Sequence, residues 1–379
     1  MIWTKQGYSP RNVLIIAELG TSHNGDISKA KEMIIAAGEA GADCVKFQIV
    51  IADEILHPNT GDVLLPCGKI ALFDRFKQLE MPPEFYAELM EFAESRALLF
   101  LCTPFGLKSA KILWELKPKI VKIASPELNF TGLLEEIVQW NLPILLSTGV
   151  SLLSDIEEAL FILNNEKNSA YNKQIQDDIP ANLCLLHCVT AYPAPESDYN
   201  LRVLGNLSGI FGIPVGVSDH SLDPELVPVL ALTQGACAIE KHFCLSNTDS
   251  GLDDPIALPP ALFSRMVQSV RHAQKAGPER TLAEMTAQHG SLTIDSILGS
   301  GIKTLSPSEK INYQRTNRSV HALRDIKAGE IINPGDFGVL RTEKVLRPGL
   351  KPSWAPVLAG KKARQFIPNG EGIRLEDIL

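Results

Sequence analysis

Short, uninterrupted runs of apolar residues recur along the first 245 residues of the chain. Such runs are typical of strands covered on both faces of a parallel sheet, because a strand with one solvated face would alternate apolar and polar positions. Eight runs of this kind are predicted to be strands: Val13–Ala17, Cys44–Phe47, Leu98–Cys102, Ile120–Ile123, Ile144–Leu146, Leu183–Leu186, Pro214–Val217 and Ala236–Ile239.

Amphipathic segments of helical length separate most of these runs. They are Ser28–Ala40, Pro83–Ser95, Leu107–Leu116, Thr131–Trp140, Ser154–Leu163 and Pro224–Thr233. Ser28 and Ser154 are suitable N-caps, and Glu157 completes a capping box with Ser154. Alternating strands and helices predict a (β/α)8 barrel over residues 1–276. A doubly wound open sheet is the alternative that the pattern leaves open.

The pattern changes after Ala276. Residues 277–317 are polar, contain few strand signals and are predicted to form a linker. Residues 318–379 are rich in glycine and proline and contain an internal repeat, in which IKAGEIINPGDF (residues 326–337) resembles IPNGEGIRLEDI (residues 367–378). Two related halves predict a pseudo-symmetric module of about 60 residues, near the lower size limit for independent folding.

Composition and charge restrict the class of protein. The 379-residue chain is 45% hydrophobic and 21% charged, which is ordinary for a globular protein. A net charge of −8 argues against nucleic acid as a partner, although basic groups inside a cleft can still bind an anion. The first ten residues do not resemble a signal peptide, and no run approaches the roughly 18 apolar residues of a membrane span. Seven cysteines without a CxxC pair indicate a reduced, cytoplasmic enzyme.

A polar side chain follows almost every predicted strand. In a barrel these positions form the catalytic face, where strands end and loops begin. Two of them are lysines, which is unexpected for a purely structural set because an isolated buried ammonium group is costly. The set therefore indicates an active site. Its members are Glu18, Lys46, Thr103, Lys122, Ser125, Glu127, Ser147, Thr190, Tyr192, Ser218, Asp219, His220, Glu240 and His242.

The lysines and small hydroxyls indicate a phosphate or carboxylate site. Lys46 and Lys122 supply positive charge, and Ser125 and Ser147 can donate hydrogen bonds. A lysine in such a place could equally form a Schiff base, as in an aldolase. The residue types alone leave both interpretations open.

His220 and His242 follow adjacent strands and are expected to face one cavity. Neutral imidazoles suit manganese, iron, cobalt or zinc, and two protein ligands leave coordination positions for substrate and water. A hydrogen-bonded structural histidine is the alternative. Asp219 and Glu240, which precede the histidines, could orient the imidazoles or serve as a base.

These residues, in this order, resemble the sialic acid synthase family over essentially the whole chain. The resemblance implies a (β/α)8 TIM barrel followed by a small C-terminal domain of β-clip type, the antifreeze-like (SAF) domain. It also implies condensation of phosphoenolpyruvate with N-acetylmannosamine or a related 2-acetamido sugar, giving a nine-carbon 2-keto acid and phosphate. The motifs that carry it are AELGTSHNG (17–25), VKFQ (45–48), CTPFG (102–106), KIASPELN (122–129), LLSTGVS (145–151), LLHCVTAYPAP (185–195), GVSDHS (216–221) and IEKHF (239–243).

The resemblance assigns a role to each matching residue. His220 and His242 are expected to bind the divalent metal, usually Mn²⁺, with Mg²⁺ or Co²⁺ possible. Lys46, Lys122, Thr103, Ser125 and Ser147 are expected to contact phosphoenolpyruvate. Glu18 and Glu127 are the expected acids near the reacting atoms, and Tyr192 and Asp253 correspond to the sugar-binding region. Thr190 stands where some members have Asn. Beyond these assignments, Glu240 is a further catalytic candidate and Ser218 a further candidate substrate contact.

The family members are homodimers in which each small domain covers the barrel mouth of its partner. An arginine of the small domain reaches the substrate, and Arg341 is the predicted residue because it directly follows the strand-like Phe337–Leu340. Arg347, in the sequence RPG, is the alternative. A domain-swapped homodimer is therefore expected.

Three other functions stay open at this stage. A synthase for legionaminic or pseudaminic acid, or a spore-coat polysaccharide homologue, would use the same barrel with another sugar. A metal-independent aldolase would form an imine at Lys46 or Lys122. A non-catalytic sugar-binding barrel would retain the fold without the chemistry.

Overall fold

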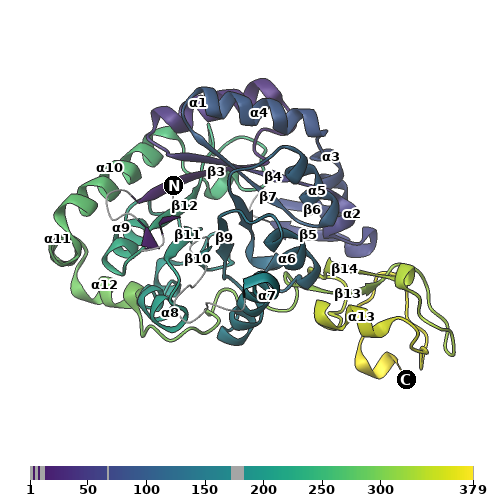
Figure 1. Cartoon of the computed structure of the whole chain (residues 1–379). Helices are drawn as coiled ribbons and strands as arrows, with labels where there is room; N and C mark the ends of the chain where they lie inside the picture. The colour runs from purple at the N-terminus through teal and green to yellow at the C-terminus, as the bar shows by residue number, and fades with distance from the viewer. Residues whose placement is uncertain (1–2, 5–6, 9–12, 66–67, 172–182, 379) are drawn as a thin grey trace.

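A computed structural model describes residues 3–4, 7–8, 13–65, 68–171 and 183–378, and it places them in a barrel and a small C-terminal domain (Figure 1). A short antiparallel pair, β1 (Trp3–Thr4) and β2 (Gly7–Tyr8), precedes the barrel. Within the described residues, no helix has the length and apolar character needed to cross a membrane.

Eight parallel strands form the barrel. Each strand pairs with the next along the chain, the last pairs with the first, and β7 lies beside β8 to complete the circle. This arrangement confirms the predicted barrel and excludes the open sheet. The strands are β3 (Leu14–Gly20), β4 (Cys44–Ile49), β7 (Leu99–Pro104), β8 (Val121–Ile123), β9 (Ile144–Ser147), β10 (Leu183–Cys188), β11 (Val215–Asp219) and β12 (Ala238–His242).

Helices surround the strands in a ring (Figure 1). The sequence pattern did not indicate α8, because Gly205 and Gly209 weaken its helix propensity. Burial of Val203, Leu204 and Leu207 stabilises this helix instead. The ring consists of α1 (Ile27–Glu39), α4 (Pro83–Ser95), α5 (Leu107–Glu115), α6 (Thr131–Val138), α7 (Leu153–Tyr171), α8 (Val203–Phe211), α9 (Leu226–Thr233) and α10 (Pro260–Ala276).

The loop after β4 is enlarged into a small layer at the barrel mouth. Its apolar side chains, among them Val50, Ile55 and Leu56, form a separate cluster with Phe105, which directly follows β7. This layer gives the small domain a surface on which to pack. Its elements are α2 (Ala52–Ile55), β5 (Asp62–Leu65), β6 (Gly68–Ala71) and α3 (Leu72–Gln78).

The segment predicted to be a linker begins with two further helices, α11 (Pro278–His289) and α12 (Ser291–Leu298). Met285, Ile294 and Ile297 are buried against the barrel, so this part belongs to the barrel rather than to a connection. Few apolar side chains suffice to dock the two short helices, and the polar composition therefore obscured them. Only residues 299–317 run between the two domains without regular helices.

The small domain contains β13 (Arg318–Ala322) and β14 (Phe337–Arg341), which pair antiparallel, and the short helix α13 (Ala355–Leu358). The repeat noted in the sequence is structural, because Ile326 and Ile367 at corresponding positions pair with each other. Asp336 and Asp377, also at corresponding positions, each accept a backbone hydrogen bond in a short 3-10 turn.

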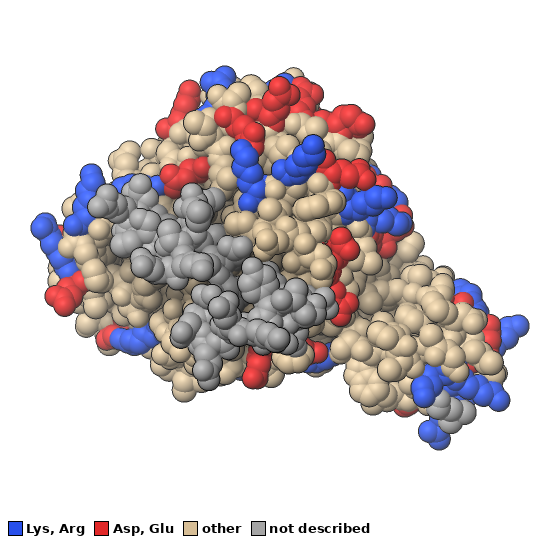
Figure 2. Space-filling view, viewed as in Figure 1, with Lys and Arg blue, Asp and Glu red and all other residues tan. Residues whose placement is uncertain are grey.

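The small domain contacts the mouth of the barrel. Leu56 of the barrel forms a β-bridge with Arg341, and the loop around Asn369 bonds to His57 and Asn59. On the face shown in Figure 2, described acidic and basic side chains intermingle over the barrel, and basic side chains gather at the tip of the small domain.

Candidate active site

Alternation along two neighbouring strands brings the histidines into the barrel mouth. Ser218 and His220 follow one face of β11, and Glu240 and His242 follow the same face of β12. The Ser218 hydroxyl donates to Glu240 Oε1 at 2.9 Å, and the two imidazole centroids lie 5.4 Å apart. The predicted proximity of the histidines is thus observed.

The residues between them point the opposite way. Lys241 Nζ forms a fully buried ion pair with Asp219 at 2.6 Å and also donates to the Ser221 hydroxyl. Asp219 therefore does not orient His220, which was one of the two roles that the sequence left open for it. Its position, one residue out of phase with His220, explains the difference, because successive strand residues face opposite sides.

Glu240 instead lies between the two predicted lysines. Its Oε1 atom is 3.2 Å from Lys46 Nζ and 3.8 Å from Lys122 Nζ. Lys46 also pairs with Glu18 at 2.7 Å, and Gln48 donates to the other Glu18 oxygen at 2.6 Å. The strand-end residues thus form one buried charge cluster. Gln48 was not among the predicted site residues, although its spacing from Lys46 places it on the same strand face.

Burial and charge set the protonation of this cluster. Burial lowers the pKa of Lys122 to about 8, despite the nearby Glu240. Burial acts in the same direction on Lys46, but Glu18 and Glu240 outweigh it and raise the Lys46 pKa. Burial also raises the pKa of Glu18, whereas the two lysines outweigh burial at Glu240 and lower its pKa to about 2. Lys122 and Glu18 are consequently the groups most readily switched between charge states.

Three of the predicted hydroxyls find no hydrogen-bond partner in the described part of the protein. Among the residues that the structure describes, Thr103 Oγ1, Ser147 Oγ and Thr190 Oγ1 are buried without a hydrogen-bond partner. Ser125 accepts from the Gly149 amide at 3.0 Å. Buried polar atoms are nearly always bonded. Thr103 and Ser147 lie on the strands that pair with those of Lys46 and Lys122, so these hydroxyls indicate the site of a polar, anionic ligand.

Tyr192 and Asp253 complete the mouth near the histidines. The Tyr192 ring stacks on His220 with centroids 4.3 Å apart. Asp253 Oδ2 lies 3.8 Å from His242 Nδ1, and burial raises the pKa of Asp253 to about 6. Both residues therefore lie where a ligand of the histidine site would pass.

The two histidines fit a metal site that is completed by substrate and water. His220 Nδ1 donates to the Val189 carbonyl at 2.8 Å, which directs its Nε2 lone pair away from the backbone. Burial lowers the pKa of His242 and so favours the neutral imidazole that binds metals. Burial has the same tendency at His220, but the nearby Cys188 raises the His220 pKa to about 9, so a metal would displace a proton there. In the described part of the chain, no group of three or more His, Cys, Asp or Glu is arranged around a metal position.

Glu127 has a different environment from the other acids. It accepts hydrogen bonds from Arg341 Nη2 at 2.8 Å and from Arg318 Nε at 3.0 Å, both from the small domain. Arg347 instead pairs with Asp377 inside the small domain at 2.6 Å. Of the two candidate arginines, Arg341 is therefore the one that reaches the barrel.

Arg318 is a site residue that the sequence prediction missed. It is fully buried, donates to backbone carbonyls of Glu54 and Phe105, and lies 5.3 Å from the Phe130 ring centre. The only signal of Arg318 in the sequence was a charged residue at the first position of a strand. In this chain the small domain contacts its own barrel, whereas the resemblance led us to expect the barrel of a partner.

Comparisons with known proteins agree with this geometry. The NeuB family model matches residues 33–280, and the SAF domain model matches residues 317–379. The chain belongs to the NeuB family. This membership, together with the barrel, confirms the predicted family, fold class and enzyme class, a C–C bond-forming transferase.

Three relatives illustrate the similarity. The N,N'-diacetyllegionaminic acid synthase of Campylobacter jejuni is 35% identical over 87% of this chain and 91% of its own length. The structure of the spore coat polysaccharide biosynthesis protein SpsE of Bacillus subtilis has a TM-score of 0.77 at 32% identity, covering 97% of this chain and 95% of that one. The N-acetylneuraminic acid synthetase of Leptospira borgpetersenii has a TM-score of 0.63 at 30% identity, covering 76% and 95%.

Proposed function

We propose that this enzyme condenses phosphoenolpyruvate with an open-chain 2-acetamido sugar of the N-acetylmannosamine type. The products are a nine-carbon 2-keto sugar acid and phosphate. The observation that carries the proposal is that the buried hydroxyls of Thr103 and Ser147, on strands adjacent to those of Lys46 and Lys122, lack a hydrogen-bond partner among the described residues. Two neighbouring histidines lie at the same barrel mouth. Membership of the NeuB family supports the same reaction class.

Phosphoenolpyruvate would occupy the lysine end of the site. Lys46 and Lys122 compensate its charge, and Thr103, Ser125 and Ser147 hydrogen-bond its phosphate and carboxylate oxygens. The Lys122 pKa of about 8 rises when an anion binds beside it, so binding stabilises the charged lysine.

The sugar would occupy the opposite end. Asp253, Tyr192, Thr190 and Ser218 line this part, and Arg341 covers it from the small domain. His220 and His242 would hold a divalent metal, with Mn²⁺ proposed and Mg²⁺ or Co²⁺ as alternatives. When bound, such a metal supplies Lewis-acid polarisation of the aldehyde oxygen.

The reaction follows from holding both substrates at near-attack distance. C3 of phosphoenolpyruvate bonds to the aldehyde carbon, and positive charge develops at C2. Water adds to C2, and the proton it releases balances the one taken up by the new hydroxyl. The C2–O bond to phosphate then breaks as the C2 hydroxyl becomes the keto group, and its proton passes to the leaving phosphate. Glu18, whose pKa burial raises, is the proposed proton relay, because two arginines already bind Glu127.

The sugar is identified by screening. Phosphoenolpyruvate and Mn²⁺ are incubated with a panel of aminosugars, including N-acetylmannosamine and diacetylated sugars, and mass spectrometry detects a product that gains three carbons. The Campylobacter relative is an N,N'-diacetyllegionaminic acid synthase, so a diacetylated sugar is the second candidate substrate. Trapping of an imine with pyruvate and borohydride, without a metal requirement, would instead identify a Schiff-base aldolase. An inactive barrel that binds sugar would show neither result.

We further propose a homodimer that exchanges its small domains. Domain swapping replaces contacts within one chain by the same contacts between two, so the Glu127–Arg341 contact is retained. Inactive Lys122→Ala and Arg341→Ala chains are co-expressed, and recovery of activity is expected because a mixed dimer contains one intact site. A monomer by light scattering, or a mixture without activity, would show that each small domain serves its own barrel.

A further inference from the structure

Val150, in the loop between β9 and α7, has a backbone conformation that branched residues rarely adopt. Its φ is +44°, in the left-handed region where a branched side chain crowds the backbone. Such a conformation persists only where surrounding contacts enforce it, and it is frequent at functional sites. The loop directly follows Ser147, one of the unpaired hydroxyls of the proposed phosphate site.

The enforcing contacts come from residues 299–317, which we call the bracing segment. The Glu309 carboxylate accepts from the Val150 amide, and the Asn317 side chain donates to the Val150 carbonyl at 3.0 Å. Lys303 Nζ donates to the Thr148 carbonyl at 3.0 Å. Both backbone polar groups of Val150 are therefore bound by the segment that joins the two domains.

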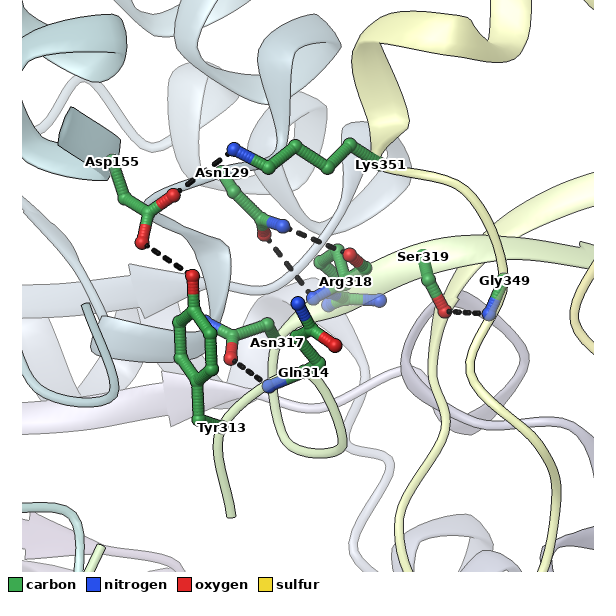
Figure 3. Close-up of a pocket in the computed structure, with 9 residues that line it drawn as sticks. All are labelled: Asn129, Asp155, Tyr313, Gln314, Asn317, Arg318, Ser319, Gly349 and Lys351. Carbon is green, nitrogen blue, oxygen red and sulfur yellow. Dashed lines mark hydrogen bonds and ion pairs between the residues drawn. The ribbon is translucent and has the colours of Figure 1, made fainter. Parts of the chain in front are cut away.

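The same segment and the small domain hold the start of α7. Asp155 accepts from the Tyr313 hydroxyl at 3.0 Å and from Lys351 Nζ at 3.0 Å, and it also accepts from the Leu152 amide. These side chains converge from barrel, bracing segment and small domain around a cavity of about 100 Å³ (Figure 3). The loop is thus fixed at both ends.

On its inner side the loop packs tightly against Ser125, a proposed phosphate ligand, and against Thr190, which lines the proposed sugar end. A Cβ atom at Gly149 would lie 2.2 Å from Thr190 Oγ1 and 2.9 Å from Ser125 Oγ. The Gly149 amide also donates to Ser125. A shift of Val150 would therefore displace Ser125, whose hydroxyl is proposed to bind phosphate.

Glu309 is the central residue of this brace. It is 1% exposed, and its second oxygen accepts from the Ser306 amide and hydroxyl at 3.2 and 2.9 Å. We propose that Glu309 is a positioning residue that holds the Thr148–Val150 turn in the shape required for phosphoenolpyruvate. The connection between the domains thereby completes the phosphate site, an inference that rests on the proposed function.

The test compares Glu309→Ala, Glu309→Gln and the exposed neighbour control Lys310→Ala. Binding of phosphoenolpyruvate alone is measured by calorimetry, and both KM values are measured by phosphate release with the best aminosugar. Glu309→Ala should weaken phosphoenolpyruvate binding by about 10- to 100-fold, as for loss of a hydrogen bond to a charged group, and leave the sugar KM nearly unchanged. Glu309→Gln retains an acceptor oxygen and should recover most of the affinity, and Lys310→Ala should resemble the wild type.

A second variant tests the role of the backbone conformation. Glycine adopts positive φ without crowding, so Val150→Gly combined with Glu309→Ala should bind phosphoenolpyruvate more tightly than Glu309→Ala alone. Unchanged phosphoenolpyruvate affinity in Glu309→Ala, or an equal rise in both KM values, would overturn the inference. Turnover by the wild type would still uphold the proposed function in that case. Wild-type protein without turnover on any sugar would refute the function instead. If Glu309→Ala does not fold, Asn317→Ala carries the same expectation.

Discussion

Lys46 and Lys122 share the carboxylate of Glu240, but their pKa values shift in opposite directions. Lys46 has a second carboxylate, Glu18, at 2.7 Å, which outweighs the effect of burial. Lys122 forms its ion pair with Glu240 at the longer distance of 3.8 Å, and burial lowers its pKa to about 8. Two buried lysines thus differ chiefly because Glu18 pairs closely with Lys46, and Lys122 depends on its ligand to stay charged.

This difference predicts a pH dependence for phosphoenolpyruvate binding. Above pH 8 free Lys122 loses its proton, so the affinity should fall as the pH rises from 8 to 9.5, by roughly tenfold per pH unit at most. Calorimetric titrations at constant ionic strength measure the effect. Lys122→Arg should remove this dependence because arginine stays charged, and the exposed Lys119→Arg should not. A pH profile that is identical in wild type and Lys122→Arg would contradict the assignment.

The paired histidines predict direct Mn²⁺ binding. The wild type should bind one Mn²⁺ per chain, detected by loss of the free-ion electron paramagnetic resonance signal. His242→Ala should weaken binding by more than about 10- to 100-fold, the loss typical of altering even a residue that only orients a metal ligand. His272→Ala, which removes an exposed histidine paired with Glu284, is the matched control. Chelation should abolish turnover and Mn²⁺ restore it, whereas full activity without metal would refute the site.

At the scale of elements, sequence periodicity located the strands well and helix starts less well. The helix predicted to begin at Ser28 begins at Ile27, with Asp26 as its N-cap, and α7 begins at Leu153 rather than after a Ser154 cap. Several nearby residues could cap these helices, and tertiary packing selects one of them. Strands were easier because burial on both faces imposes a continuous apolar run. They extend beyond these runs through the polar site residues, as Glu18 and His242 show.

The buried pair between neighbouring strands predicts a large effect on stability. Lys241→Met leaves Asp219 as an unpaired buried charge, so the free energy of unfolding should fall by about 3–5 kcal/mol. Urea denaturation followed by circular dichroism measures the change. Lys119→Met removes a partly exposed pair with Glu94 and should cost at most about 1 kcal/mol. Equal losses of unfolding free energy in both variants would show that burial of the Lys241–Asp219 pair is not the cause of the loss.

At the scale of the whole molecule, charged and polar contacts made by residues 299–378 hold the small domain on the barrel. Arg318 and Arg341 bind Glu127, and Lys351 binds Asp155. The small domain has its own apolar cluster around Val320, Ile326 and Ile367. It can therefore fold around its own core and still depend on ionic contacts for its position on the barrel.

This domain should lose stability in acid through His321. His321 is fully buried, and burial lowers its pKa to about 4 from an ordinary value of 6.5. Its contribution is complete above pH 6.5 and is lost as the pH falls towards 4, because the unfolded state binds the proton more readily. The loss should reach about 3 kcal/mol, measured by thermal unfolding between pH 7 and 4. His321→Gln should reduce this dependence, and the exposed His272→Gln should not.

The sequence by itself determined the barrel and indicated which polar residues gather at its mouth. Buried strands produce continuous apolar runs, and the polar residues at their ends are local features of the sequence. Lys46, Lys122, His220 and His242 could therefore be predicted, and all four are buried in the structure. The tertiary structure alone decided which of these side chains pair. Glu127 with Arg318 and Val150 with Glu309 are separated by 191 and 159 residues, and contacts at such distances leave no periodic signal in a single sequence. Features that depend on residues close together in the sequence were therefore predictable, whereas contacts between residues far apart in the sequence required the tertiary structure.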